Sequence, residues 1–124
     1  MPTNILLAED SPAMRAFLVS AIDGLEDVEV IEASSGFEAL KLLPRRQFSL
    51  IITDINMPDI NGLELINFVR QNDAYKNIPL IVVTTKGRER DRDKGIALGA
   101  NEYLVKPIDP DHFVEVVKKY IKQV

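Results

Sequence analysis

Short apolar runs alternate with longer segments of helical periodicity along this 124-residue chain. Each run is about four residues long and mostly apolar at both odd and even positions, which is typical of strands buried on both faces of a parallel sheet. The runs are Ile5 to Ala8, Val28 to Ile31, Leu50 to Thr53, Leu80 to Val83 and Tyr103 to Val105. We therefore expect five parallel strands.

The segments between the first runs carry signals for helix ends. Ser11 followed by Pro12 predicts an N-cap and a first-turn proline, and Gly24 is placed to close that helix. Ser35 and Glu38 have the spacing of a capping box, in which each side chain bonds to the backbone N–H of the other residue. Pro44 then ends this second helix, because proline cannot continue it.

Three more helices follow the same logic. Asn61 is a candidate N-cap for an amphipathic segment, and the segment from Glu89 to Leu98 ends at Gly99, a residue suited to the left-handed position. Asp109 and Pro110 begin a helix with an inward apolar stripe. Five strands alternating with five helices indicate an α/β doubly wound sheet, and the length predicts a single domain over residues 1–124.

The composition excludes several classes of function. Cysteine is absent, so thiol nucleophiles, thiolate metal sites and disulfides are excluded. The net charge of -4 argues against nonspecific nucleic-acid binding, which basic side chains drive. The apolar runs are far shorter than the roughly 20 residues of a membrane-spanning helix, and the first residues lack the basic region of a secretory leader. We expect a cytoplasmic domain with no membrane insertion.

Charge is distributed unevenly along the chain. Residues 1–85 hold 12 acids and 6 bases, whereas residues 86–124 hold 7 acids and 9 bases. The run from Lys86 to Lys94 alternates five bases with three acids, which is usually a solvated, salt-bridged helix face. Because its balance is positive, a docking surface for an acidic partner is the alternative interpretation.

Residues able to do chemistry follow four of the five predicted strands. Glu9 and Asp10 follow the first strand, Asp54 the third, Thr84 the fourth and Lys106 the fifth. Taken singly, an acid at a strand end often caps the next helix or is solvated. Because parallel strands share one carboxyl edge, where ligands of open α/β sheets bind, we expect these side chains to meet in one site.

The residue types in this site favour phosphoryl transfer. Three neighbouring carboxylates repel one another, and a divalent cation relieves that repulsion. A donor set of oxygen atoms alone indicates a hard ion such as Mg²⁺. With Lys106 as a second positive charge and Thr84 as a hydroxyl donor, Asp54 is placed to act as the nucleophile and form an acyl phosphate.

The same residues resemble a known signature. Glu9-Asp10, the segment Asp54 to Gly62, Thr84 and the segment Tyr103 to Pro107 together look like the motifs of two-component response-regulator receiver domains. The spacings are 44 residues from Asp10 to Asp54, 30 to Thr84 and 22 to Lys106, so the resemblance covers essentially the whole chain. It implies a flavodoxin-like sheet of strand order 2-1-3-4-5, as in chemotaxis regulators that consist of one receiver domain.

The resemblance also implies a role for each matching residue of the site. Asp54 corresponds to the phosphoacceptor that takes its phosphoryl group from a histidine kinase or phosphotransfer protein. Glu9, through a water molecule, together with Asp10, Asp54 and the backbone carbonyl of Asn56, corresponds to the Mg²⁺ site. Lys106 corresponds to the lysine beside the phosphoryl group, aimed by a cis peptide bond to Pro107.

A conformational switch is the third implication. Thr84 and Tyr103 match the switch pair, which remodels the surface of the fourth helix, fifth strand and fifth helix and so controls binding of a downstream protein. We expect a monomer or a weak, phosphorylation-dependent dimer. The protein would not be an enzyme in the usual sense, although it would assist its own phosphorylation and dephosphorylation.

Other functions fit these residues less well. A phosphatase of the haloacid-dehalogenase type needs a second acid two residues after the nucleophile, where this chain has Asn56. A flavodoxin relative needs hydroxyl groups and glycine in its first loop, where Glu9 and Asp10 would repel a phosphate. A receiver-like scaffold that acts independently of phosphorylation remains as the alternative.

Overall fold

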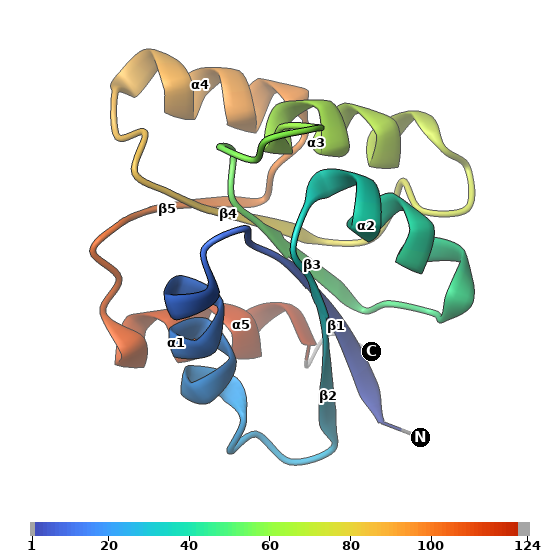
Figure 1. Cartoon of the computed structure of the whole chain (residues 1–124), viewed down its shortest axis with the longest axis vertical. Coiled ribbons are helices and arrows are strands. Elements are labelled where there is room, and N and C mark those ends of the chain that lie inside the picture. Colours follow the sequence, from blue (N-terminus) through green and yellow to red (C-terminus); the bar gives the residue numbers. More distant parts are fainter. Residues whose placement is uncertain (1, 122–124) are drawn as a thin grey trace.

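The computed structural model describes residues 2–121 and contains the expected five-stranded parallel sheet, in the order β2-β1-β3-β4-β5 (Figure 1). The strands are β1 (Thr3–Ala8), β2 (Val28–Ala33), β3 (Leu50–Thr53), β4 (Leu80–Thr84) and β5 (Glu102–Val105). The helices are α1 (Pro12–Ile22), α2 (Gly36–Leu42), α3 (Gly62–Gln71), α4 (Glu89–Leu98) and α5 (Pro110–Ile121), with a short 3₁₀ turn, η1 (Leu43–Arg45), after α2. Fold class and strand order are both confirmed.

Helices cover both faces of the sheet. Figure 1 shows α2, α3 and α4 on one face and α1 and α5 on the other. Alternate residues of the central strands point to opposite faces: Leu6 and Ile51 pack under α2 and α3, whereas Leu7 and Ile52 pack against α1 and α5. Each face therefore has its own apolar core. Because both faces are buried, the central strands are apolar at odd and at even positions alike.

The two edge strands depart from the expected burial. The central strands β3 and β4 are buried throughout, but β2 exposes Glu29 and Glu32, and Val105 at the end of β5 is 42% exposed. An edge strand has a neighbour on one side only, so its burial is less complete than that of a central strand. The prediction of complete burial on both faces holds for the centre of the sheet and not for its edges.

Two of the predicted helix ends need correction. Helix α1 begins with Ser11 as expected, but it ends at Ile22 with Asp23 in a right-handed conformation, and the left-handed residue of this connection is Asp27 (φ 58°) rather than Gly24. At α2 the Ser35 hydroxyl accepts from Glu38 N, but the Glu38 carboxylate accepts from Ser34 N. Only half of the predicted capping box is formed.

The other predicted helix signals, at the starts of α3 and α5 and at the end of α4, are confirmed. Asn61 and Glu64 form a complete capping box at α3, and α4 ends at Gly99 with φ 124°. Pro110 is the first residue of α5, whose Phe113 is fully buried in the core shared with α1. None of the helices found within residues 2–121 combines the length and the apolar character needed to cross a bilayer.

Candidate functional site

The candidate site lies where the strands end. β1 leads directly into Glu9 and Asp10, β3 into Asp54 and β5 into Lys106, while Thr84 is the last residue of β4. The sheet hydrogen bonds continue one step beyond the strands: Asp54 N donates to Ala8 O (3.0 Å), and Lys106 N donates to Thr84 O (2.8 Å). These bonds fix the backbone from which the side chains of Asp54 and Lys106 project.

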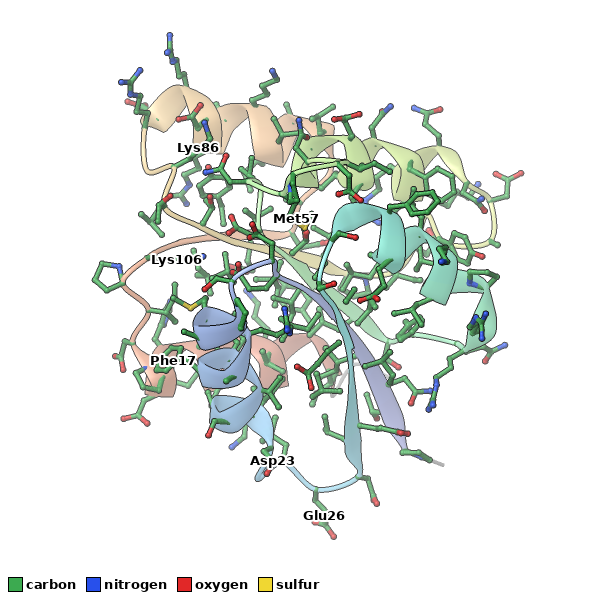
Figure 2. All side chains as sticks on the ribbon, viewed as in Figure 1. Phe17, Asp23, Glu26, Met57, Lys86 and Lys106 are labelled. Carbon is green, nitrogen blue, oxygen red and sulfur yellow. The ribbon has the colours of Figure 1, made fainter. Side chains whose placement is uncertain are left out.

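Figure 2 places this edge within the molecule. Met57, Lys86 and Lys106 lie toward the end where β4 and β5 finish, whereas Asp23 and Glu26 lie at the opposite end of the fold. The candidate site is therefore separated from the loop between α1 and β2 by the length of the strands.

Three carboxylates meet at this edge. One carboxylate oxygen from each of Glu9, Asp10 and Asp54 lies within 4.8 Å of the others. Glu9 and Asp54 are 1% and 6% exposed, while Asp10 is open to solvent. A set of three carboxylates with one open side fits a hard divalent cation that keeps some of its water, which is how Mg²⁺ binds in proteins.

Lys106 lies against two of these acids. Its Nζ donates to Glu9 Oε1 (2.9 Å) and to Asp54 Oδ2 (3.0 Å), and its side chain is 11% exposed. Burial lowers the pKa of Lys106, but the hydrogen bonds and charges of Glu9 and Asp54 outweigh it, so the net pKa is raised. The ammonium group is therefore held charged beside Asp54.

Glu9 responds differently to the same surroundings. Burial raises its pKa most, and the charge of Asp54 raises it further, against the lowering effect of hydrogen bonds from Lys106 and from Ser11 N. The net pKa is raised, as the crowding of carboxylates predicts. The negative charge of Glu9 is therefore costly in this cluster, and a bound cation would offset that cost.

Asp54 is oriented through both of its carboxylate oxygens. Oδ1 accepts from Ile55 N (2.6 Å) and Asn56 N (3.3 Å), while Oδ2 accepts from Lys106. The carboxylate is therefore held in one orientation, with Oδ2 facing the lysine. The Lys106–Pro107 peptide bond is cis, as the resemblance implied.

The two candidate switch residues are both bonded to Lys86. The Thr84 hydroxyl accepts from Lys86 N (3.2 Å), and the Tyr103 hydroxyl donates to Lys86 O (2.6 Å). Tyr103 is 6% exposed, and its ring lies so close to Gly95 of α4 that an added Cβ there would be 3.1 Å from it. The Tyr103 ring is therefore turned inward, and the Thr84 hydroxyl is bonded to the loop between β4 and α4.

A residue to which the sequence pattern assigned no role also helps to form the site. Arg15 of α1 donates to the backbone carbonyl of Glu9 (2.7 Å) and pairs with Glu32 of β2 (3.2 Å). It thereby fixes the loop that carries Glu9 and Asp10. The one available signal was its position four residues after the N-cap Ser11, which places it on the helix face below that cap.

The charged run from Lys86 to Lys94 is solvated but is not salt-bridged. Within residues 2–121, no ion pair of 4.0 Å or less involves a side chain of this run. Most of its side chains are exposed on α4 and the loop before it. The basic side chains of this run are therefore mostly exposed to solvent, and the expected pairing within the run is absent.

Comparisons with known proteins agree with this geometry. The family model described as "Response regulator receiver domain" matches residues 5–118. A chemotaxis protein CheY homolog of Campylobacter jejuni is 36% identical over 122 residues, which cover 98% of this chain and 91% of the relative.

Solved structures show the same likeness. The crystal structure of a putative response regulator from Chloroflexus aurantiacus matches with a TM-score of 0.92 and 31% identity, over 99% of this chain and all of that one. The Mn²⁺-bound form of response regulator Rcp1 matches with a TM-score of 0.89 and 27% identity, over 99% and 97%. With its family model, relatives and fold in agreement, this chain belongs to the response-regulator receiver domains of the CheY type.

Proposed function

We propose that this receiver domain, spanning residues 1–124, accepts a phosphoryl group on Asp54 from the phosphohistidine of a histidine kinase or phosphotransfer protein, in a Mg²⁺-dependent reaction. The observation that carries the proposal is the position of Asp54, buried among carboxylates with Oδ2 3.0 Å from Lys106 Nζ. A carboxylate between a cation site and an ammonium group is placed to attack phosphorus, because phosphoryl transfer depends on positioning and charge neutralisation.

The cation site is made of Glu9, Asp10, Asp54 and the backbone carbonyl of Asn56, with Glu9 acting through water. Mg²⁺ bound there would neutralise charge on the transferring phosphoryl oxygens. The Mn²⁺-bound form of Rcp1 supports a divalent cation in a protein of this fold. The donor set in this chain is entirely oxygen, which favours Mg²⁺ over softer ions.

Each protein group has one task in the transfer. An oxygen of Asp54 forms a bond to phosphorus while the bond from phosphorus to the donor histidine nitrogen breaks, which leaves an acyl phosphate on the receiver. Lys106, already charged and bonded to the carboxylate, moves its contact to the phosphoryl group. The Thr84 hydroxyl donates a hydrogen bond to a phosphoryl oxygen.

The new dianion then favours a second arrangement of the β4–α4 loop. To reach the phosphoryl group, the Thr84 hydroxyl gives up the hydrogen bond that it accepts from Lys86 N. Tyr103 is bonded to the carbonyl of the same Lys86, so the loop and the ring respond together. A ligand that contacts two arrangements differently shifts their populations.

The surface that changes is formed by α4, β5 and α5, and we propose that it controls binding of a downstream protein. The exposed bases of the run from Lys86 to Lys94 favour a partner with an acidic docking patch. The protein would act as a monomer or a weak, phosphorylation-dependent dimer, without direct contact to nucleic acid. It assists its own phosphorylation and dephosphorylation and otherwise works by binding.

The first prediction tests the phosphoacceptor. The purified protein, incubated with Mg²⁺ and a small phosphodonor such as acetyl phosphate, should gain one phosphoryl group by intact mass spectrometry. Asp54→Asn should gain none, because an amide oxygen is a poor nucleophile. Asp23→Asn, which changes an acid at the opposite end of the molecule (Figure 2), is the matched control and should be phosphorylated normally.

Two results would count against the proposal. An adduct that persists in Asp54→Asn would move the acceptor to another residue. The absence of an adduct on the wild-type protein with every donor would favour a receiver-like scaffold that acts independently of phosphorylation.

A further inference from the structure

The loop between β3 and α3 is closed at its base. Gly62 N donates to Ile55 O (2.8 Å), and Asp54 Oδ1 accepts from the first two backbone N–H groups of the loop. This closure holds the start and the end of residues 55–61. In the middle of the loop Met57 is buried in the apolar core, and the polar contact of that part is made by Asp59. The loop carries Asn56, whose backbone carbonyl belongs to the proposed cation site.

Asp59 fastens the middle of this loop to the second helix. Its Oδ1 accepts from Ile60 N (2.7 Å) and from Gly36 N (3.2 Å), and its Oδ2 accepts from Phe37 N (3.1 Å). Gly36 and Phe37 are the first two residues of α2, whose N–H groups have no partner within the helix. One side chain thus bonds to two residues of another segment, which are 23 and 22 positions before it in the sequence.

A backbone contact joins the same two segments independently of Asp59. A Cβ built on Gly36 would lie 2.3 Å from Ile60 O and 2.8 Å from Ile60 Cβ. Contacts this short leave no space for any side chain at position 36. The loop and the start of α2 are therefore packed backbone to backbone, and the Asp59 carboxylate closes this contact from the outside.

The state of Asp59 suits this task. Hydrogen bonds from backbone N–H groups, that of Ile60 first and that of Phe37 after it, lower the pKa of its carboxyl group. The side chain is therefore ionised at neutral pH, and an anion at a helix N-terminus is also favoured by the helix dipole. Asp59 is exposed, yet the hydrogen bonds account for both of its oxygens.

We propose that Asp59 is a positioning residue for the cation site: it ties the β3–α3 loop to α2 and so holds the Asn56 carbonyl in place for Mg²⁺. The proposal depends on the cation site described under the proposed function. Asp59 itself does not touch the cation or the phosphoryl group. Its effect passes through the backbone of residues 56–59.

The test is a Mg²⁺ titration of the ¹⁵N-labelled full chain, followed by the amide signals of the site in NMR spectra, which reports affinity without needing phosphorylation. Groups that orient metal ligands typically change metal affinity by about 10- to 100-fold. Since Asp59 acts on one ligand of several, we expect Asp59→Ala to weaken Mg²⁺ binding by about tenfold. Asp59→Asn should lie in between, because its remaining oxygen can still accept from Ile60 N and Gly36 N.

Glu38→Ala is the matched control. Glu38 also accepts a backbone hydrogen bond at the start of α2, from Ser34 N, but it makes no contact with the β3–α3 loop through that bond. This variant should destabilise the same helix end and leave Mg²⁺ affinity within about twofold of the wild-type value, well below the effect of a ligand-orienting group. Hydrogen exchange of the Ile60 and Phe37 amides without Mg²⁺ should accelerate in Asp59→Ala and stay unchanged at Ile60 in Glu38→Ala.

The outcomes separate this inference from the proposed function. Equal Mg²⁺ affinity of wild type and Asp59→Ala would overturn the positioning role and leave the cation site intact. An equal loss in Glu38→Ala would also overturn it, since stability of α2 would then explain the effect. If the wild-type protein bound no Mg²⁺, both proposals would fail. Should Asp59→Ala not fold, the comparison is made with Asp59→Asn.

Discussion

At the scale of single residues, Gly62 decides how closely α3 approaches Asp54, the proposed phosphoacceptor. A Cβ at this position would lie 2.2 Å from Asp54 O and 2.8 Å from Ile55 Cα. Both neighbours are backbone atoms, which cannot move aside as the end of a long side chain can. Gly62 is also buried and bonded through its N–H to Ile55 O. The closed base of the loop after Asp54 therefore requires a residue without a side chain.

This requirement predicts a large loss of stability in Gly62→Ala. Overpacking in a tight interior costs about 1–3 kcal/mol, and we expect the free energy of unfolding to fall by at least that much. Urea denaturation followed by circular dichroism measures it. Gly24→Ala is the control, because a Cβ at Gly24 would have no heavy atom within 4 Å.

The control should change stability by no more than about 1 kcal/mol, and in the stabilising direction, since alanine restricts the unfolded chain. Equal effects of the two substitutions would show that the close contact at Gly62 relaxes at little cost. Reduced phosphorylation of a folded Gly62→Ala protein would show that the contact also positions Asp54.

At the scale of elements, Glu102 joins β5 to α5. Its Oε2 accepts hydrogen bonds from Tyr120 Oη (2.5 Å) and from Lys119 Nζ (3.2 Å). Burial raises the pKa of Glu102, but the bonds from Tyr120 and Lys119 outweigh it, and the net pKa is lower than its ordinary value of 4.5. Burial, together with the hydrogen bond to Glu102, raises the pKa of Tyr120 to about 12.

The lowered pKa predicts an acid-dependent loss of stability. A carboxylate with a lower pKa in the folded state stabilises the fold at pH values above 4.5 and loses that contribution as the pH falls through the folded-state pKa. Since Lys119 is well exposed, we expect a contribution of less than about 1 kcal/mol. Urea denaturation of wild type and Glu102→Gln between pH 3 and 7 should therefore converge at the acid end.

Glu115→Gln, at an exposed position of α5, is the matched control for this pH series. It should follow the wild-type curve over the whole range. A constant difference between wild type and Glu102→Gln at every pH would contradict the assignment, because the link would then not depend on the charge of Glu102.

At the scale of the whole molecule, the fold concentrates like charge at one edge of the sheet. Glu9, Asp10 and Asp54 approach one another closely, and Lys106 offsets only part of their repulsion. A cation bound to the folded state and not to the unfolded chain stabilises the fold by mass action. The cluster therefore links the stability of the protein to its proposed cofactor.

The corresponding prediction concerns metal removal. Mg²⁺ at about 100 times its dissociation constant should raise the free energy of unfolding by about 2.7 kcal/mol over the protein in chelator. Asp10→Asn should lose most of this gain, because it removes one carboxylate of the cluster. Asp10 is exposed, so the substitution should have little effect on packing. Chemical denaturation with and without Mg²⁺ measures both values.

Asp23→Asn, at the far end of the fold, should keep the full effect of Mg²⁺. A gain of the same size in Asp10→Asn would place the cation elsewhere. No gain in the wild-type protein would argue against a Mg²⁺ site in this cluster.

Much of the architecture follows from local patterns. The five apolar runs and the signals at Ser11, Asn61 and Gly99 predict the strands and most helix ends, because capping and backbone conformation depend on neighbouring residues. The errors are also local in origin. Gly24 is a residue type that favours the left-handed conformation, but Asp27, three residues later, is the one that adopts it. The Glu38 carboxylate accepts from Ser34 N instead of from Ser35 N.

The membership of the site was also accessible from the sequence, because parallel strands place their carboxyl ends at one edge and so bring Glu9, Asp54 and Lys106 together. The contacts between the site residues could not be predicted in this way. Lys106 pairs with Asp54 and Glu9 across 52 and 97 residues, and Asp59 reaches α2 across more than 20. Strand order and register decide such contacts, since they set which distant side chains face one another, and no local periodicity encodes them. The sequence by itself thus determined the helices, the strands and the residue types at the site. Tertiary packing decided which of these side chains pair with one another.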